Sequence, residues 1–173
     1  MRFLAFIFAF ITTAHAQIAA LKSENIHASI TVPANWELGT LENQPVLIPK
    51  GTDAQKSPRL HIHFFISRHQ SGTLEDAMNA EINGITEKNP DSSNAKAYFL
   101  GAIPLKTRSG IDGILARFAY PQEPGKGRLF TNQKFYFKDT SGKIVTVCMH
   151  VWSNETAAAQ YQQFLIENLI TGN

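Results

Sequence analysis

Apolar and polar side chains alternate along much of the chain, and a repeat of two residues is typical of strands with one buried face. In the segment NIHASITVP, Ile26, Ala28, Ile30 and Val32 alternate with polar neighbours before Pro33 ends the run. Patterns of this kind predict strands at seven places: 25–33, 45–50, 59–67, 96–106, 111–120, 128–138 and 143–152. Turn residues separate the last four strands, which predicts successive antiparallel hairpins.

Two segments have helical spacing instead. In residues 72–88 apolar side chains recur every three or four positions, and Thr73 with Asp76 matches a capping box. Residues 154–170 have a second apolar face, formed by Ala158, Tyr161, Phe164, Leu165 and Leu169, between a cap at Ser153 or Asn154 and an end at Gly172. We therefore expect the α+β class: a long antiparallel sheet of about seven strands flanked by two amphipathic helices. Residues 34–44 join the first two strands, and Trp36 is expected to pack on the core as a lid.

The first sixteen residues have the pattern of a secretory signal peptide. Arg2 precedes the apolar run Phe3–Ile11, and Ala14 and Ala16 match the small residues of a cleavage site. The run is shorter than the roughly 20 residues that span a bilayer. We expect cleavage after Ala16.

The mature chain is expected to be a single domain, residues 17–173, that is periplasmic or secreted. Its first residue would be Gln17 and not a cysteine, so no lipid anchor is expected. No later stretch is apolar enough for a transmembrane segment. Cys148 is the single cysteine, so the domain has no internal disulfide and its stability must come from the core.

A resemblance rests on the order of these elements and on the motif ITVPANWE. A strand that closes on Pro33 with Trp36 following, then an acid-capped helix, four hairpin strands and a C-terminal helix, resembles the PsbP-like and DcrB-like families over the mature chain. The resemblance implies an αβα sandwich of PsbP-like type. It also implies a binding or assembly module at a membrane complex, with no shared catalytic residues. Only Pro33 and Trp36 match the pattern of these families, and the resemblance implies a structural role for both.

Histidines and the cysteine are the candidate metal ligands. His61 and His63 are two residues apart in one predicted strand, and Cys148 and His150 are two apart in another, so each pair shares a face. If the strands are close and the faces coincide, the four residues could bind zinc or copper, which imidazole and thiolate both suit. The alternative is a semi-exposed face beside a helix, with Cys148 as a small buried hydrophobe.

Charge gives a second candidate surface. Residues 101–143 carry eight basic but only three acidic side chains. Five bases are expected at hairpin ends and edges, where they could meet an anionic surface such as lipid headgroups or a cell-wall polymer: Lys106, Arg108, Lys126, Arg128 and Lys143. The alternative is a solvated rim that protects the strand edges from aggregation. Nucleic acid is not expected, because aromatic and basic residues are not interleaved.

The leading hypothesis is an exported, non-enzymatic binding or assembly module without a cofactor, which engages an envelope or membrane-associated protein or an anionic envelope surface. The G-x-S-x-G and H-E-x-x-H motifs of hydrolases and metalloproteases do not occur. The first alternative is a periplasmic zinc- or copper-binding protein that uses the four ligands above. The second is an enzyme with His61, His63 or His150 as its acid or base.

Overall fold

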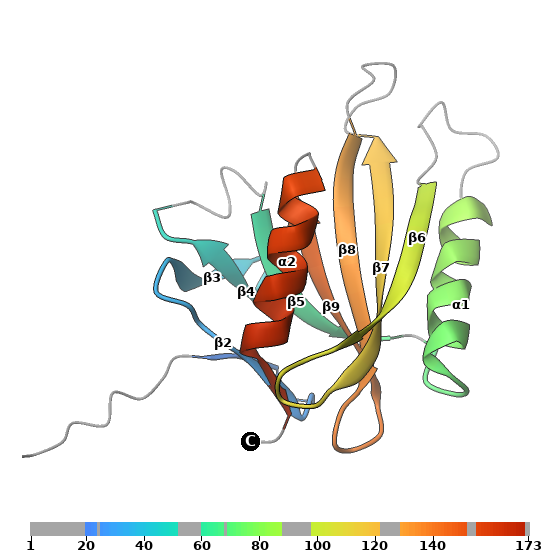
Figure 1. Cartoon of the computed structure of the whole chain (residues 1–173), viewed down its shortest axis with the longest axis horizontal. Helices are drawn as coiled ribbons and strands as arrows, with labels where there is room; N and C mark the ends of the chain where they lie inside the picture. Colours follow the sequence, from blue (N-terminus) through green and yellow to red (C-terminus); the bar gives the residue numbers. More distant parts are fainter. Residues whose placement is uncertain are drawn as a thin grey trace, which may run out of the picture.

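The described part of the chain forms two antiparallel sheets and two helices (Figure 1). The computed structural model describes residues 20–23, 25–51, 60–67, 69–87, 98–121, 129–151 and 155–171. Within these ranges the elements are β1 (Ala20–Lys22), β2 (Ala28–Thr31), β3 (Trp36–Leu41), β4 (Gln44–Pro49), β5 (Leu60–Ile66), α1 (Leu74–Glu87), β6 (Tyr98–Lys106), β7 (Asp112–Pro121), β8 (Leu129–Lys138), β9 (Ile144–Val151), α2 (Glu155–Asn168) and β10 (Leu169–Thr171). The helix caps and end predicted at Ser153, Asn154 and Gly172, and the signal peptide at 1–16, lie outside the described residues.

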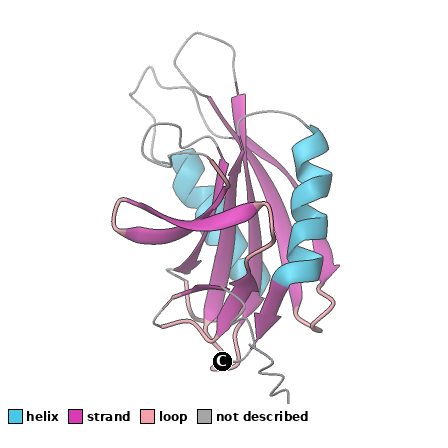
Figure 2. Ribbon diagram, turned by 90° about the vertical axis from the view of Figure 1, so that its left-hand side faces the viewer, coloured by secondary structure: helices cyan, strands magenta, loops and turns pink. Residues whose placement is uncertain are grey.

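The larger sheet is the framework of the fold. Among the described residues it has seven strands in the order β3-β4-β5-β9-β8-β7-β6, and every neighbouring pair is antiparallel. Figure 2 shows the two helices on opposite faces of this sheet. The predicted α+β class, with a long antiparallel sheet between two helices, is therefore confirmed. No helix in the described residues is long and apolar enough to cross a membrane.

Each helix buries one apolar face against the sheet. On one side α2 and the small sheet β1-β2-β10 pack on the larger sheet through a broad core that includes Ile30, Ile62, Val147, Tyr161 and Leu165. On the other side α1 packs on β7 and β8 through a smaller cluster that includes Ala77, Ala116, Phe118, Tyr136 and Ile144. The α1 side of β5 and β9 therefore lies beside the helix.

The start of α1 matches the predicted capping box. The N–H of Thr73 donates to the Asp76 carboxylate at 2.7 Å, and the N–H of Asp76 donates to the Thr73 hydroxyl at 3.1 Å. The two residues thus satisfy each other's backbone donors, which the first helical turn leaves without partners.

Two predicted boundaries were wrong. Residues 34–44 contain the edge strand β3, which pairs with β4 in the larger sheet, whereas β2 belongs to the small sheet. The predicted helix over 154–170 ends at Asn168, and Leu169–Thr171 continue as β10, paired with β2. β10 gains its backbone hydrogen bonds from β2, a strand far away in sequence that local patterns do not report, whereas β3 gains them from β4, its partner in a hairpin whose turn the pattern did not reveal.

Candidate functional site

The four candidate metal ligands meet on the α1 side of β5 and β9. These strands are adjacent and antiparallel, and their register pairs His61 with His150 and His63 with Cys148. Directly paired residues present their side chains on the same face of a sheet. The two conditions that the sequence left open, neighbouring strands and a common face, are both met.

Three imidazoles from these strands form a cluster, called here the histidine cluster: His61, His63 and His150. The rings stack nearly parallel, with centroids 4.4 Å apart for His61 and His150 and 5.2 Å apart for His63 and His150. One ring nitrogen from each residue lies within 4.8 Å of the other two. Zinc and copper bind such nitrogens at about 2.0–2.1 Å, so nitrogens on one ion are at most about 4 Å apart. Binding of one ion by all three nitrogens therefore requires a small movement of the rings, for which χ2 is a soft torsion.

Burial keeps two of these imidazoles neutral at pH 7. Loss of solvent, followed by the charges of His61 and Lys134, lowers the pKa of His63 from 6.5 to about 4. Loss of solvent, followed by His61, His63 and Lys134, lowers the pKa of His150 to about 3. A neutral imidazole keeps a free lone pair on one nitrogen, which is the form that binds a metal ion.

Cys148 lies next to the cluster but is not an activated nucleophile. Its Sγ is 3.3 Å from His150 Nε2, and the side chain is buried. Burial, partly offset by Lys134, raises the pKa of the thiol from 9.0 to about 12. The neutral thiol and neutral imidazole therefore differ from the thiolate–imidazolium pair of cysteine enzymes. The pKa values of His63 and His150 are also far below neutral, whereas a general acid or base works best near the operating pH.

A buried ion pair borders the histidine cluster. Lys134 on β8 is paired across the sheet with Cys148, and its ammonium contacts the Glu81 carboxylate on α1. The side chains of Lys134 and Glu81 are only 9% and 23% exposed. Glu81 also accepts a hydrogen bond from the Tyr136 hydroxyl. The ion pair thus attaches α1 to the sheet beside the cluster.

Sequence reasoning missed this ion pair, although a signal was present. Glu81 follows Ala77 by four residues and Met78 by three, so it lies on the apolar face of the predicted helix. Lys134 shares its strand face with Tyr136, two residues away. A charged residue beside apolar or aromatic neighbours on each of two elements that pack together indicates a pair between them, because buried charges need partners.

The residues of the predicted basic surface are partly engaged within the fold. Three of them lie at the end of the sheet that carries the β6–β7 and β8–β9 turns: Lys106, Arg108 and Lys143. The other two, Lys126 and Arg128, lie outside the described residues. Lys106 Nζ pairs with the Asp112 carboxylate at 3.0 Å, and Lys143 Nζ donates to the Asn25 carbonyl at 3.0 Å. Contact with an anionic surface stays a prediction.

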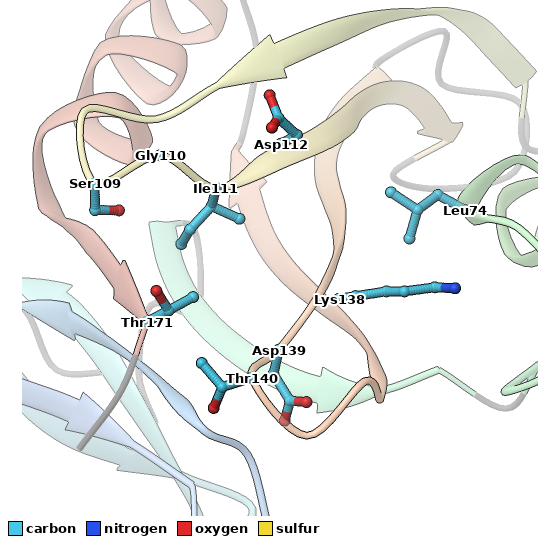
Figure 3. A pocket seen from close by; sticks show the side chains of 9 residues that line it. All are labelled: Leu74, Ser109, Gly110, Ile111, Asp112, Lys138, Asp139, Thr140 and Thr171. Atoms are coloured by element: carbon cyan, nitrogen blue, oxygen red, sulfur yellow. The ribbon is translucent and has the colours of Figure 1, made fainter.

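A hollow of about 400 Å³ opens at this end of the sheet, between the two turns, the start of α1 and the end of β10 (Figure 3). Asp139, on its floor, accepts hydrogen bonds from the backbone N–H groups of Ser141 and Lys143. Asp112 on its rim is the partner of Lys106. Both carboxylates therefore already have partners within the fold, and they stabilise the two turns.

The two residues singled out by the resemblance lie on the other face of the sheet. Pro33 and Trp36 line a hollow of about 620 Å³ together with Met149 and Phe164 of the α2 side. The rings of Trp36 and Phe164 are 5.2 Å apart, and Trp36 packs against the larger core. Pro33 and Trp36 therefore lie on the opposite face of the larger sheet from the histidine cluster.

Comparison with known proteins identifies the fold. No family model matches the sequence, and no curated protein matches it. The solution structure of cyanobacterial PsbP (CyanoP) from Synechocystis is 10% identical and has a TM-score of 0.55, over 92% of this chain and 95% of that one. The crystal structure of LpqN, involved in cell envelope biogenesis of Mycobacterium tuberculosis, is 10% identical with a TM-score of 0.54, over 84% and 83% of the two chains. The predicted PsbP-like fold is confirmed, and at these identities the likeness concerns the fold alone.

Proposed function

We propose that the mature chain is an exported, non-enzymatic binding domain whose ligand is a zinc or copper ion held by His61, His63 and His150. The observation that carries the proposal is the convergence of three ring nitrogens, from two adjacent strands, to within 4.8 Å of one another. Imidazole nitrogen suits both ions. The low pKa values of His63 and His150 make these ligands available at neutral pH without the loss of a proton.

The position of the histidine cluster also suits a binding site. β5 and β9 are interior strands of the larger sheet, and ligands on strands are held more precisely than ligands on loops. His61 is buried at 7% exposure, whereas His63 and His150 are half-buried. The buried His61 is therefore held in place by its surroundings, whereas His63 and His150 keep the outer side of the site accessible to an ion.

The test is metal titration of the mature chain, purified without a histidine tag. Elemental analysis and titration with zinc and copper are expected to give one ion per chain. The variant His61→Ala/His63→Ala should bind more than about 100-fold more weakly, since loss of a residue that only supports a ligand already costs 10–100-fold. The matched control is His27→Ala/His69→Ala, which removes two histidines outside the cluster and should bind as the wild type does. Absence of binding at micromolar metal, or equal affinity in both variants, would contradict the proposal.

A second candidate function, binding to an envelope or membrane-associated protein, has an observation of its own. The edge strand β6 exposes four large apolar side chains by 43–53%: Tyr98, Phe99, Leu100 and Ile103. Apolar groups gathered on one edge are typical of a contact surface, and an edge strand can pair with a strand of a partner. The role in cell envelope biogenesis that is stated for LpqN, which shares the fold, also supports binding to an envelope protein.

The test of this second candidate is co-purification from an envelope fraction. The wild type is expected to retain one protein that Phe99→Lys/Ile103→Lys loses. Leu38→Lys, which changes an exposed residue of the opposite edge strand β3, should retain it. Recovery of no protein, or equal recovery with all three chains, would exclude β6 as the contact.

A further inference from the structure

We infer that the hollow beside Trp36 is a second binding site, which takes an extended, proline-rich peptide segment that carries a basic residue. The inference depends neither on the histidine cluster nor on β6. It gives the chain a partner of defined chemistry on the α2 side of the larger sheet. Three features carry it: the walls and length of the hollow, its hydrogen-bond donors, and its charge.

The walls of the hollow are mainly apolar and suit the rings of proline. The apolar part of the lining consists of Pro33, Trp36, Pro49, Met149 and Phe164. The rings of Trp36 and Phe164 are tilted by 52° with their centroids 5.2 Å apart, so they form a corner and not a flat stack. Proline-rich segments dock in grooves lined by aromatic rings, because their polyproline II helix is already ordered before it binds.

The length of the hollow matches a short stretch of such a helix. Five lining residues belong to α2, where they recur every three or four positions from Gln160 to Asn168 and so share one face. Eight steps along an α-helix rise about 12 Å, whereas a polyproline II helix rises about 3.1 Å per residue. The hollow therefore follows α2 over the length of about four peptide residues. Its volume of about 620 Å³ is also within the roughly 300–1,000 Å³ of ligand sites.

The polar part of the lining offers donors to the carbonyl groups of a peptide. Proline has no N–H group, but the carbonyl oxygens of a polyproline II helix are not bonded within the helix and can accept from a partner. Among the described residues, the indole N–H of Trp36 and the side-chain amides of Asn35 and Gln160 have no acceptor. The indole N–H of a buried ring usually has a partner, and Trp36 is half-buried. These donors are therefore available to a ligand that brings acceptors.

The charge of the hollow favours a basic residue in the ligand. Glu167 is the only charged side chain among the described residues of the lining. Its carboxylate accepts a hydrogen bond from the side-chain amide of Gln163, and a carboxylate has about four lone-pair sites, so it can accept from a ligand as well. Arginine suits this position because its guanidinium pairs with carboxylates and also stacks on aromatic rings. An acidic ligand would meet negative charge instead.

The test is titration of the mature chain with synthetic peptides, followed by calorimetry and by the indole N–H resonance of Trp36 in NMR spectra. The peptide PPPPPR is expected to bind saturably and to shift that resonance. GSGSGR has the same charge without the polyproline II preference, and it should not bind. PPPPPE should bind about tenfold more weakly than PPPPPR, because repulsion from Glu167 replaces attraction. Trp36→Phe identifies the resonance, and loss of its donor should weaken binding of PPPPPR about fivefold.

A charge-reversal variant tests the role of Glu167 by itself. Glu167→Lys should bind PPPPPE more tightly than PPPPPR, a result that loss of folding cannot produce. The matched control Glu75→Lys, which changes an exposed acid of α1 on the other face of the sheet, should keep the wild-type preference, and so should His61→Ala/His63→Ala.

Three results would overturn the inference: no saturable binding of PPPPPR at millimolar concentration, equal binding of GSGSGR, or an unchanged preference in Glu167→Lys. Binding of the neutral disaccharide cellobiose in place of PPPPPR would overturn it as well, and would assign the hollow to a saccharide. None of these results depends on whether the histidine cluster binds a metal ion.

Discussion

Acidification from pH 7.5 to pH 5 is expected to lower the free energy of unfolding of the metal-free protein by about 4 kcal/mol. The folded-state pKa values of His63 and His150 are about 4 and about 3, against 6.5 for an unperturbed histidine. Between those values the unfolded chain binds more protons than the folded chain does. The stability is therefore fully present above pH 6.5 and is lost as the pH falls toward the folded-state values, with about 2 kcal/mol from each histidine at pH 5.

Urea unfolding at pH 7.5, 6 and 5 in the presence of a chelator measures this effect. His63→Asn/His150→Asn should lose much less stability over the same range, because the groups that take up protons on unfolding are gone. His27→Asn/His69→Asn, with the same number of histidines removed outside the cluster, should keep the wild-type dependence. The acidic groups with lowered pKa, Asp76 and Asp139, titrate below this window and do not contribute to it. Parallel pH dependence in the wild type and the cluster variant would show that the imidazoles are not desolvated.

The sequence predicts the larger part of the fold because its strands and helices are patterned strongly enough to be recognised one at a time. The two segments that it missed have different causes, an unusual turn for β3 and a long-range strand pairing for β10. The β3–β4 hairpin turns at Glu42 and Asn43, both with positive φ of 50° and 64°, over a two-residue connection. In a sequence, two-residue turns of this kind are usually marked by Asn-Gly or another glycine pair, and the pair Glu42-Asn43 does not match that pattern. Leu169 keeps the spacing of the helical face but becomes the first residue of β10, because β2 offers it a backbone partner.

The histidine cluster was partly visible in the sequence, and the missing step is physical. A repeat of two residues assigns His61 with His63, and Cys148 with His150, to shared faces, but it does not order the strands. β5 and β9 are separated in the chain by a helix and three strands, so their adjacency follows only from the topology of the finished sheet. Burial and the resulting pKa values depend on the same adjacency. The sequence therefore supplies the ligand types, and the topology supplies the site.

Glu81→Leu is expected to lower the free energy of unfolding by about 3–5 kcal/mol, the usual cost of leaving one member of a buried ion pair alone. It would leave the ammonium of Lys134 inside the interface between α1 and the sheet, where that side chain is 9% exposed. Burial already lowers the pKa of Lys134, in the direction expected for a desolvated ammonium. The Tyr136 hydroxyl would lose its acceptor as well.

Urea unfolding at pH 7.5 measures this cost against two other variants. Glu75→Leu changes an exposed acid in the first turn of α1, where only the helix dipole is affected, and should cost less than about 1 kcal/mol. Glu81→Leu/Lys134→Met removes both charges and should recover most of the loss, since apolar replacement of a whole buried pair is often neutral or stabilising. A Glu81→Leu variant as stable as Glu75→Leu would show that the pair is screened by solvent. A double variant as unstable as Glu81→Leu would instead assign the loss to Tyr136, whose hydroxyl would have no acceptor in either chain.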